Sequence, residues 1–173
     1  MSMDLFVYTK NLSSDLIPTL AKRFADYGMT VDFHPDFQFD EEIDKGFLPI
    51  KFNISNSYIT SSNHSDQDPV SGFELYFDDY NYQQEVEELS DADEKYVASQ
   101  ELDNKLKTCN KTVSISFKAG DESEFTLSAF FATFLTELTD GIMYDPQTGK
   151  YYDGESALRF FPKSVDAYEE AWE

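Results

Sequence analysis

The sequence predicts an α+β fold of two layers: an antiparallel or mixed sheet with helices packed mainly on one face, in a single domain spanning residues 1–173. Several segments alternate apolar and polar residues with a period of two, which is typical of strands with one covered and one wet face. Other segments carry apolar side chains at helical spacing. Because these helices and strands follow one another irregularly, repeated parallel-crossover units are not expected. The chain is long enough for one sizeable core.

The predicted strands are rich in aromatic and branched side chains. Residues 113–118 form the clearest one, with apolar residues alternating with serine and lysine. Strands are also predicted over residues 3–9, 30–34, 47–54 and 73–80, and a β-hairpin joins residues 142–144 to 150–152 through a turn that contains proline and glycine. Pro49 cannot donate a backbone hydrogen bond, which indicates an edge strand or the start of a strand.

The helix that follows Asp121 is predicted to be central, because its apolar residues Leu127, Phe131, Phe134 and Leu138 form a wide face. Asp121 is a suitable N-cap, and Glu124 lies at the position of the reciprocal capping residue. Helices are also predicted over residues 15–27, 93–107 and most of 156–172, with a break at Pro162, and polar loops over 36–45 and 55–71.

Negative charge is concentrated in one part of the chain. The formal net charge is −21, and the interval between Lys51 and Lys95 holds eleven carboxylates without one lysine or arginine. Solubility of a small domain needs a net charge of magnitude only about 2–8. Because the excess costs stability through self-repulsion, it indicates a surface that attracts a basic partner.

The candidate site is the acidic segment that follows the strand 73–80, where tyrosines are interleaved with carboxylates. Carboxylates accept charge-assisted hydrogen bonds from lysine and arginine, and tyrosines supply rigid contact area. The predicted partner-binding residues are Asp78, Asp79, Tyr80, Tyr82, Glu85, Glu87, Glu88, Asp91, Asp93 and Glu94. The alternative is a solvated acidic loop that only keeps the protein soluble.

Two neighbouring regions bear on this hypothesis. If the helices cover one face of the sheet, the other face is predicted to present Glu74, Tyr76, Asp78, Lys51 and Asn53. The segment 36–44 is a second acidic cluster, in which Phe37 and Phe39 either extend a contact surface or anchor the loop in the core.

Several classes of function find no support in the sequence. The single cysteine, Cys109, excludes an intramolecular disulfide and a multi-cysteine zinc site. Neither His34 nor His64 belongs to a nucleophile-and-base motif, and no calcium-loop signature is complete. We therefore expect no enzymatic activity, no metal and no cofactor.

The charge and the hydropathy restrict the partners further. Direct nucleic-acid binding relies on lysine and arginine, so the negative charge opposes it. The sequence lacks a run of about 18 apolar residues, and its first ten residues do not form a secretory signal. We expect a cytoplasmic protein without membrane contacts.

An acidic, aromatic-rich α+β chain of this size without catalytic motifs resembles the bacterial immunity proteins that neutralise contact-dependent or polymorphic toxins. The stretches Leu138-Thr139-Asp140-Gly141 and Tyr144-Asp145-Pro146-Gln147-Thr148-Gly149-Lys150-Tyr151 contribute to this resemblance. It implies a toxin inhibitor, or antitoxin, that binds a basic toxin domain, in many cases a nuclease, through an acidic, tyrosine-bearing surface. Immunity families share no common fold, so the resemblance implies none.

A second hypothesis is a nucleic-acid mimic that occupies the binding groove of a DNA- or RNA-binding enzyme. The two hypotheses differ in charge geometry. A mimic needs carboxylates in two parallel rows that imitate the phosphates of a duplex, whereas an inhibitor needs a compact patch beside aromatic residues.

Overall fold

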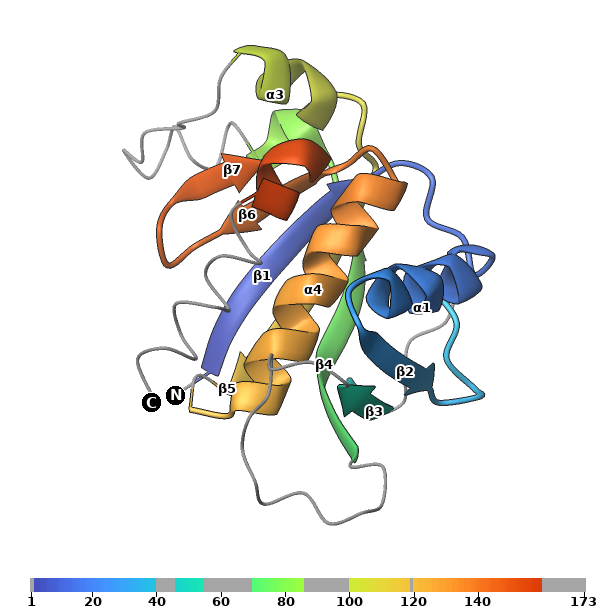
Figure 1. Cartoon of the computed structure of the whole chain (residues 1–173). Helices are drawn as coiled ribbons and strands as arrows, with labels where there is room; N and C mark the ends of the chain where they lie inside the picture. The colour runs from blue at the N-terminus through green and yellow to red at the C-terminus, as the bar shows by residue number, and fades with distance from the viewer. Residues whose placement is uncertain (1, 40–45, 55–69, 86–99, 119, 160–173) are drawn as a thin grey trace.

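The computed structural model describes residues 2–39, 46–54, 70–85, 100–118 and 120–159. They form one seven-stranded sheet in the order β2-β3-β4-β5-β1-β6-β7, in which every pairing is antiparallel. Helices α1 and α4 lie against the same face of this sheet (Figure 1). The predicted α+β fold is therefore confirmed, with an antiparallel rather than a mixed sheet.

The elements follow the predicted order closely. The strands are β1 (Ser2–Thr9), β2 (Met29–Phe33), β3 (Phe47–Ile54), β4 (Val70–Asp79), β5 (Lys111–Lys118), β6 (Ile142–Asp145) and β7 (Lys150–Tyr152). The helices are α1 (Leu16–Asp26), α3 (Gln100–Leu106) and α4 (Glu122–Leu138), and short helical segments occupy residues 82–85 and 154–159. Of the predicted helices 93–107 and 156–172, residues 93–99 and 160–172 lie outside the described residues, as do 40–45 and 55–69 of the predicted loops.

Helix α4 is the centre of the core. It packs across β1, β4, β5 and β6, and every residue from Thr126 to Thr136 is buried, as a wide-faced central helix predicts. Its Phe131 ring lies with its centroid 4.9 Å from that of Phe73 on β4. Two of its buried threonine hydroxyls bond to the preceding turn, since Thr133 Oγ1 donates to the Ala129 carbonyl at 2.8 Å and Thr136 Oγ1 donates to the Ala132 carbonyl at 2.7 Å.

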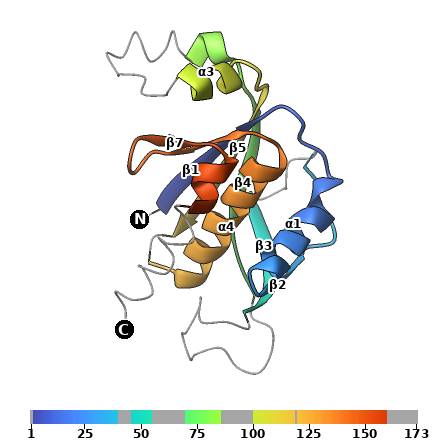
Figure 2. The same cartoon turned by 45° about the horizontal axis from the view of Figure 1, so that its top comes forward.

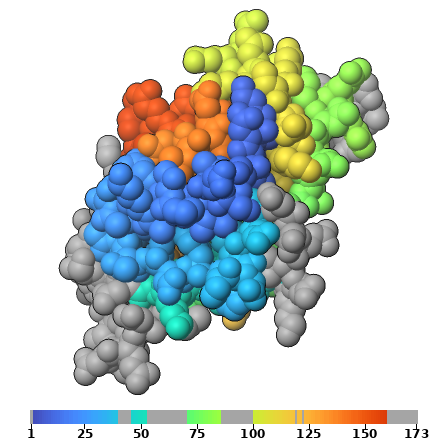
Figure 3. All heavy atoms as spheres, turned by 90° about the vertical axis from the view of Figure 1, so that its right-hand side faces the viewer, coloured from blue at the N-terminus to red at the C-terminus, as the bar shows by residue number. Residues whose placement is uncertain are grey.

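The loop after β2 contributes to this core. Phe37 and Phe39 are 5% and 3% exposed, and both rings lie within 6.5 Å of the Phe131 ring, centroid to centroid. Because these rings are covered, they anchor the loop and offer no contact area to a partner. Figure 3 shows α1 and this loop on one side of the molecule. The contact-surface interpretation of Phe37 and Phe39 is therefore wrong.

Of the two alternatives for Pro49, the edge strand is wrong, because β3 is an inner strand between β2 and β4, whereas Pro49 does lie near the start of β3 as its third residue. The Pro49 carbonyl accepts a hydrogen bond from the His34 backbone N–H at 3.3 Å, one residue beyond the end of β2. In antiparallel pairs the N–H and C=O of one residue point to the same neighbour. The missing N–H of Pro49 therefore falls where β2 has already ended.

Only one of the two predicted capping hydrogen bonds of α4 is present. Asp121 Oδ1 accepts from the Glu124 backbone N–H at 2.9 Å, so Asp121 is the N-cap. Glu124 Oε2 accepts from the Lys118 backbone N–H at 2.8 Å instead of returning to Asp121. This N–H is available because β4 no longer pairs with β5 at Lys118.

Helix α1 is held on α4 by aromatic packing and by one arginine: the Phe24 ring lies 5.1 Å from the Phe134 ring, centroid to centroid. Arg23 Nη2 donates to Glu137 Oε1 and Oε2 at 2.9 and 2.8 Å, and Arg23 Nε donates to Oε2 at 3.1 Å. The guanidinium carbon also lies 5.5 Å from the centre of the Phe134 ring. The hydrogen bonds to Glu137 raise the pKa of Arg23.

Replacing Arg23 with methionine keeps most of the aliphatic stem and removes these hydrogen bonds. We expect the free energy of unfolding, measured by urea denaturation, to fall by about 1–2 kcal/mol. The exposed neighbour Lys22, replaced in the same way, serves as the control and should change it by less than about 0.5 kcal/mol. Equal effects of the two substitutions would contradict this account of how α1 is held.

Candidate functional site

The sheet face opposite α1 and α4, called the open face here, presents two rows of side chains from adjacent strands. Strand alternation turns the core residues toward α4 and leaves their neighbours in sequence on the open face. The outer row contains Phe47, Glu74, Ser116 and Asp4, and the inner row contains Tyr76, Ser114, Phe6, Tyr144 and Tyr151. These two rows are the open-face patch. At about 4.8 Å between strands, the inner row spans roughly 19 Å.

Aromatic rings dominate the inner row. The Phe6 and Tyr144 rings stack with centroids 6.4 Å apart, and the Tyr144 and Tyr151 rings stack at 4.5 Å. Tyr76 on β4 is 46% exposed, and Phe47 in the outer row is 39% exposed. The patch therefore offers flat aromatic surface on rigid strands, which suits contact with another protein.

Tyr76 is fixed in place from two sides. Its hydroxyl donates to Glu74 Oε2 at 3.1 Å, and this hydrogen bond raises the pKa of Tyr76. On the other side the ring lies against Gly46, where a Cβ atom would come within 2.5 Å of the hydroxyl oxygen. Gly46 has φ +70°, a conformation that glycine adopts readily. The chain thus enters β3 directly beside the Tyr76 ring.

Three carboxylates border the aromatic rings: Asp4, Glu74 and Asp78, which lies opposite Thr112 on the open face. Within the part of the chain that the structure describes, none of the three forms an ion pair. The two rows contain no lysine or arginine. The patch is therefore a compact group of uncompensated negative charges beside aromatic surface.

The structure separates the predicted partner-binding residues. Asp78 is exposed on the open face, as expected for Glu74, Tyr76 and Asp78 together. Strand alternation sends Asp79 the other way, where it pairs with Lys111, and this ion pair lowers the pKa of Asp79. Glu87, Glu88, Asp91, Asp93 and Glu94 lie outside the described residues.

Tyr80 is not a surface residue, which corrects the prediction for this position. It is 9% exposed and packs with Leu106, Cys109 and Ile142 in a second hydrophobic cluster. Its ring lies 4.7 Å from the Tyr8 ring, centroid to centroid. A ring covered in this way stabilises the fold but has no face for a partner.

The second cluster closes one end of the open face. Helix α3 covers it, standing apart from α1 and α4 (Figure 2). Tyr82, which is half-buried, donates its hydroxyl hydrogen to Asp103 Oδ1 on α3 at 2.6 Å. Burial raises the pKa of Tyr151 to about 12, with smaller contributions from Tyr144 and Glu85. Glu85 itself is exposed, and its negative charge acts on the Tyr151 hydroxyl.

Cys109 belongs to the same cluster. It is buried, and this burial raises the pKa of its thiol to about 11. At neutral pH the thiolate, which is the nucleophilic form, is scarce. Cys109 therefore fills space beside Leu106, and nothing in its surroundings suggests chemistry.

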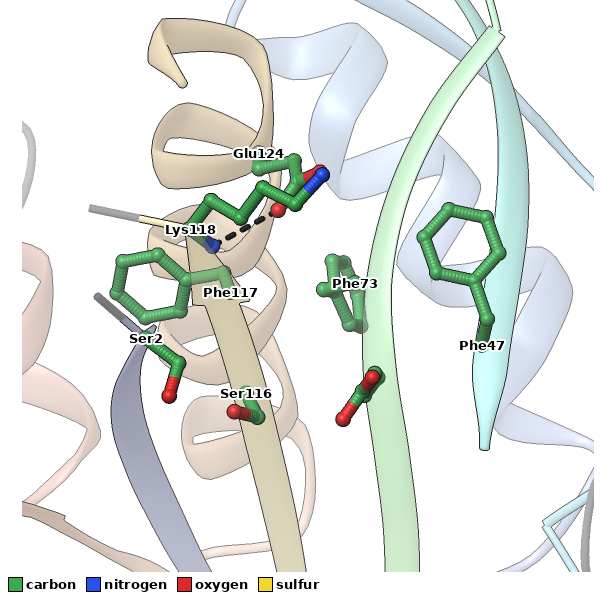
Figure 4. Close-up of a pocket in the computed structure, with 8 residues that line it drawn as sticks. Ser2, Phe47, Phe73, Ser116, Phe117, Lys118 and Glu124 are labelled. Carbon is green, nitrogen blue, oxygen red and sulfur yellow. Dashed lines mark hydrogen bonds between the residues drawn. The ribbon is translucent and has the colours of Figure 1, made fainter. Parts of the chain in front are cut away.

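A cavity of about 350 Å³ opens beside the outer row, and three residues of this row line it (Figure 4). The β4–β5 pairing ends at Glu74 and Ser116, and beyond this pair the two strands separate. The cavity is lined by Ser2, Phe47, Phe73, Glu74, Ser116, Phe117, Lys118 and Glu124. Sequence reasoning missed it, because these residues come from five elements and only the strand register brings them together.

Comparisons with known proteins add no relative: no protein-family model, curated protein or solved structure matches the chain. Among the helices that the structure describes, none combines the length and apolar character needed to cross a bilayer. Within the same described ranges, no three histidine, cysteine or carboxylate side chains converge as metal ligands would.

Gly46 and Gly149 form a matched pair for testing the Tyr76 contact. Both have a left-handed φ, +70° and +68°, but a Cβ at Gly149 meets no atom within 4 Å. We expect alanine at Gly149 to lower the free energy of unfolding by about 1 kcal/mol through backbone strain alone. Alanine at Gly46 should cost modestly more, because the exposed end of the Tyr76 side chain must turn away, and this excess should disappear in a Tyr76→Ala background. Equal costs at both glycines in urea denaturation would contradict the contact.

The raised pKa of Tyr151 predicts alkaline destabilisation. The unfolded chain loses the phenolic proton near pH 10, whereas the folded protein holds it until about 12. Stability should therefore fall as the pH rises through this window, since the unfolded state binds fewer protons there. Urea midpoints measured from pH 8 to 11.5 should fall less steeply for Tyr151→Phe than for the wild type. Identical slopes would contradict the burial of this hydroxyl.

Proposed function

We propose that this protein is an immunity-type inhibitor, which binds a basic toxin domain through the open-face patch together with Asp78. The observation that carries the proposal is the set of uncompensated carboxylates, Asp4, Glu74 and Asp78, around a stacked aromatic row. No chemical step is required of the inhibitor. It acts by occupying the active site of the toxin or an adjacent substrate-binding surface.

The two kinds of side chain have different roles in this proposal. Carboxylates that form no ion pair within the described residues attract a basic partner over a distance and raise the association rate. The aromatic rings supply contact area after docking and slow dissociation. Because both lie on paired strands, the surface loses little conformational entropy on binding.

We also include the acidic segment after residue 85 in the proposed interface, on the basis of its sequence alone. Glu87, Glu88, Asp91, Asp93 and Glu94 follow directly in sequence the helical segment 82–85, which borders the open face. Their charges would extend the attraction beyond the patch. Asp79 and Tyr80 are left out of the interface, since one is paired and the other buried.

The charge geometry favours the inhibitor over the nucleic-acid mimic. Asp4 and Glu74 lie two strands apart in the outer row, and Asp78 lies on the same strand as Glu74. At about 4.8 Å between strands and 3.4 Å per residue, the three form a triangle with sides of roughly 10–17 Å. Within the described residues this is a compact patch beside aromatic rings, and two parallel acidic rows do not occur.

Co-expression with a basic toxin domain encoded beside its gene tests the proposal. The wild-type protein should abolish toxicity and bind the purified domain with an association rate that falls as salt is added. At 20 mM salt, Asp78→Lys and Asp4→Asn should each slow association, by about tenfold for the reversal and less for the neutralisation. The difference should shrink at 500 mM salt, where charges are screened.

The matched control is Glu155→Lys. This carboxylate is 81% exposed on segment 154–159, which packs on α4 and therefore on the other side of the sheet. Its reversal changes the net charge as much as Asp78→Lys does, yet should leave the association rate within about twofold. Equal slowing by both reversals, or a toxin that stays lethal on co-expression, would contradict the proposal.

A further inference from the structure

We propose that the cavity beside the outer row is the binding pocket for an arginine side chain of the basic partner. This inference rests on the proposed function and deepens it, because it names the group that anchors the partner. The cavity is continuous with the open-face patch, since Phe47, Glu74 and Ser116 belong to both.

The walls of the cavity are aromatic. Phe73 and Phe117 are almost fully buried and fix its floor, while Phe47 is 39% exposed at its side. Figure 4 shows Phe117 and Phe47 on opposite sides with Phe73 between them. Because Phe73 and Phe117 are covered, Phe47 is the ring that can pack against the aliphatic stem of a long side chain and stack on a planar guanidinium. The volume of about 350 Å³ is at the lower end for ligand pockets and leaves room for a long side chain.

Two carboxylates in the cavity are held in fixed positions by neutral donors. Glu74 Oε2 accepts from the Tyr76 hydroxyl at 3.1 Å, and Glu124 Oε2 accepts from the Lys118 backbone N–H at 2.8 Å. Neither carboxylate forms an ion pair within the described residues. A carboxylate has about four acceptor positions, so each retains capacity for an incoming N–H group. The acceptors are therefore pre-positioned for a cation.

The guanidinium group fits these acceptors better than other chemical groups do. An anion would be repelled by two carboxylates, and a neutral ligand would desolvate them without compensation. An ammonium offers a compact charge, whereas a guanidinium presents five donors in one plane and keeps a flat face that can stack on a ring.

Lys118 provides an additional test, because removing its charge and removing a carboxylate charge should change arginine affinity in opposite directions. Its side chain lines the cavity beside Glu124 and carries the only positive charge among the lining residues. It therefore lowers the affinity of the cavity for a cation. Removing this charge should strengthen arginine binding, whereas removing the charge of Glu74 or Glu124 should weaken it.

The experiment titrates the isotope-labelled full chain with acetyl-arginine amide and follows backbone amide chemical shifts. We expect saturable shifts at Phe47, Glu74 and Lys118, with about tenfold weaker binding of the uncharged isostere acetyl-citrulline amide and weaker binding of acetyl-lysine amide. Glu74→Gln and Glu124→Gln should each weaken arginine binding at least threefold, and Lys118→Gln should strengthen it. Both glutamines retain an oxygen that accepts the existing hydrogen bond, so the fold is preserved.

Citrulline or lysine binding as tight as arginine binding, or an equal response of all three variants, would overturn the proposal. Non-saturable shifts up to 50 mM probe would overturn it as well. The probe replaces the partner protein, so the result is independent of the toxin experiment. If Asp78→Lys slows the partner while the probe does not bind, only the arginine pocket fails. If the probe binds but no toxin is neutralised, only the proposed function fails.

Discussion

The burial of α4 against one face of the sheet is the constraint on which the rest of the structure depends. Every residue from Thr126 to Thr136 is buried, so the strands beneath must present apolar side chains to this helix. Because strand side chains alternate, their neighbours are forced onto the opposite face. The positions of Glu74, Tyr76 and Phe6 are thus consequences of core packing, and they form a surface that is both rigid and outward-facing.

This arrangement also explains how a strongly acidic chain stays folded. Some negative charges are compensated where the structure needs it: Glu137 binds Arg23 between α1 and α4, and Asp79 binds Lys111 at the end of β4. The carboxylates of the open face have no such partners within the described residues. Self-repulsion there is retained, which is physically reasonable if a basic partner relieves it on binding.

The fold could be predicted from sequence to a large extent, because period-two and helical spacings report burial directly. The strand from Lys111 to Lys118 and the capped helix after Asp121 are examples in which local pattern and tertiary packing agree. Pro49 shows the limit: its residue type indicated an edge strand or a strand start, and only the position at which β2 ends explains how it fits in an inner strand.

The candidate site was predictable in part. Asp78 follows from alternation, whereas the burial of Tyr80 and the Asp79–Lys111 pair depend on contacts between distant segments. The cavity between Phe47 and Phe117 depends on where β4 and β5 stop pairing, which no local pattern encodes.

The central claim is that the open face, and not the helical side, is the surface that meets a basic protein. It is tested most directly by mapping backbone amide shifts of the labelled chain in complex with the neighbouring-gene toxin domain. The account predicts that the perturbed amides cluster on β4, β5 and β1 around Glu74, Ser114 and Phe6, while those of α1 stay unchanged. Perturbations centred on α1, or spread evenly over both sides of the sheet, would contradict it.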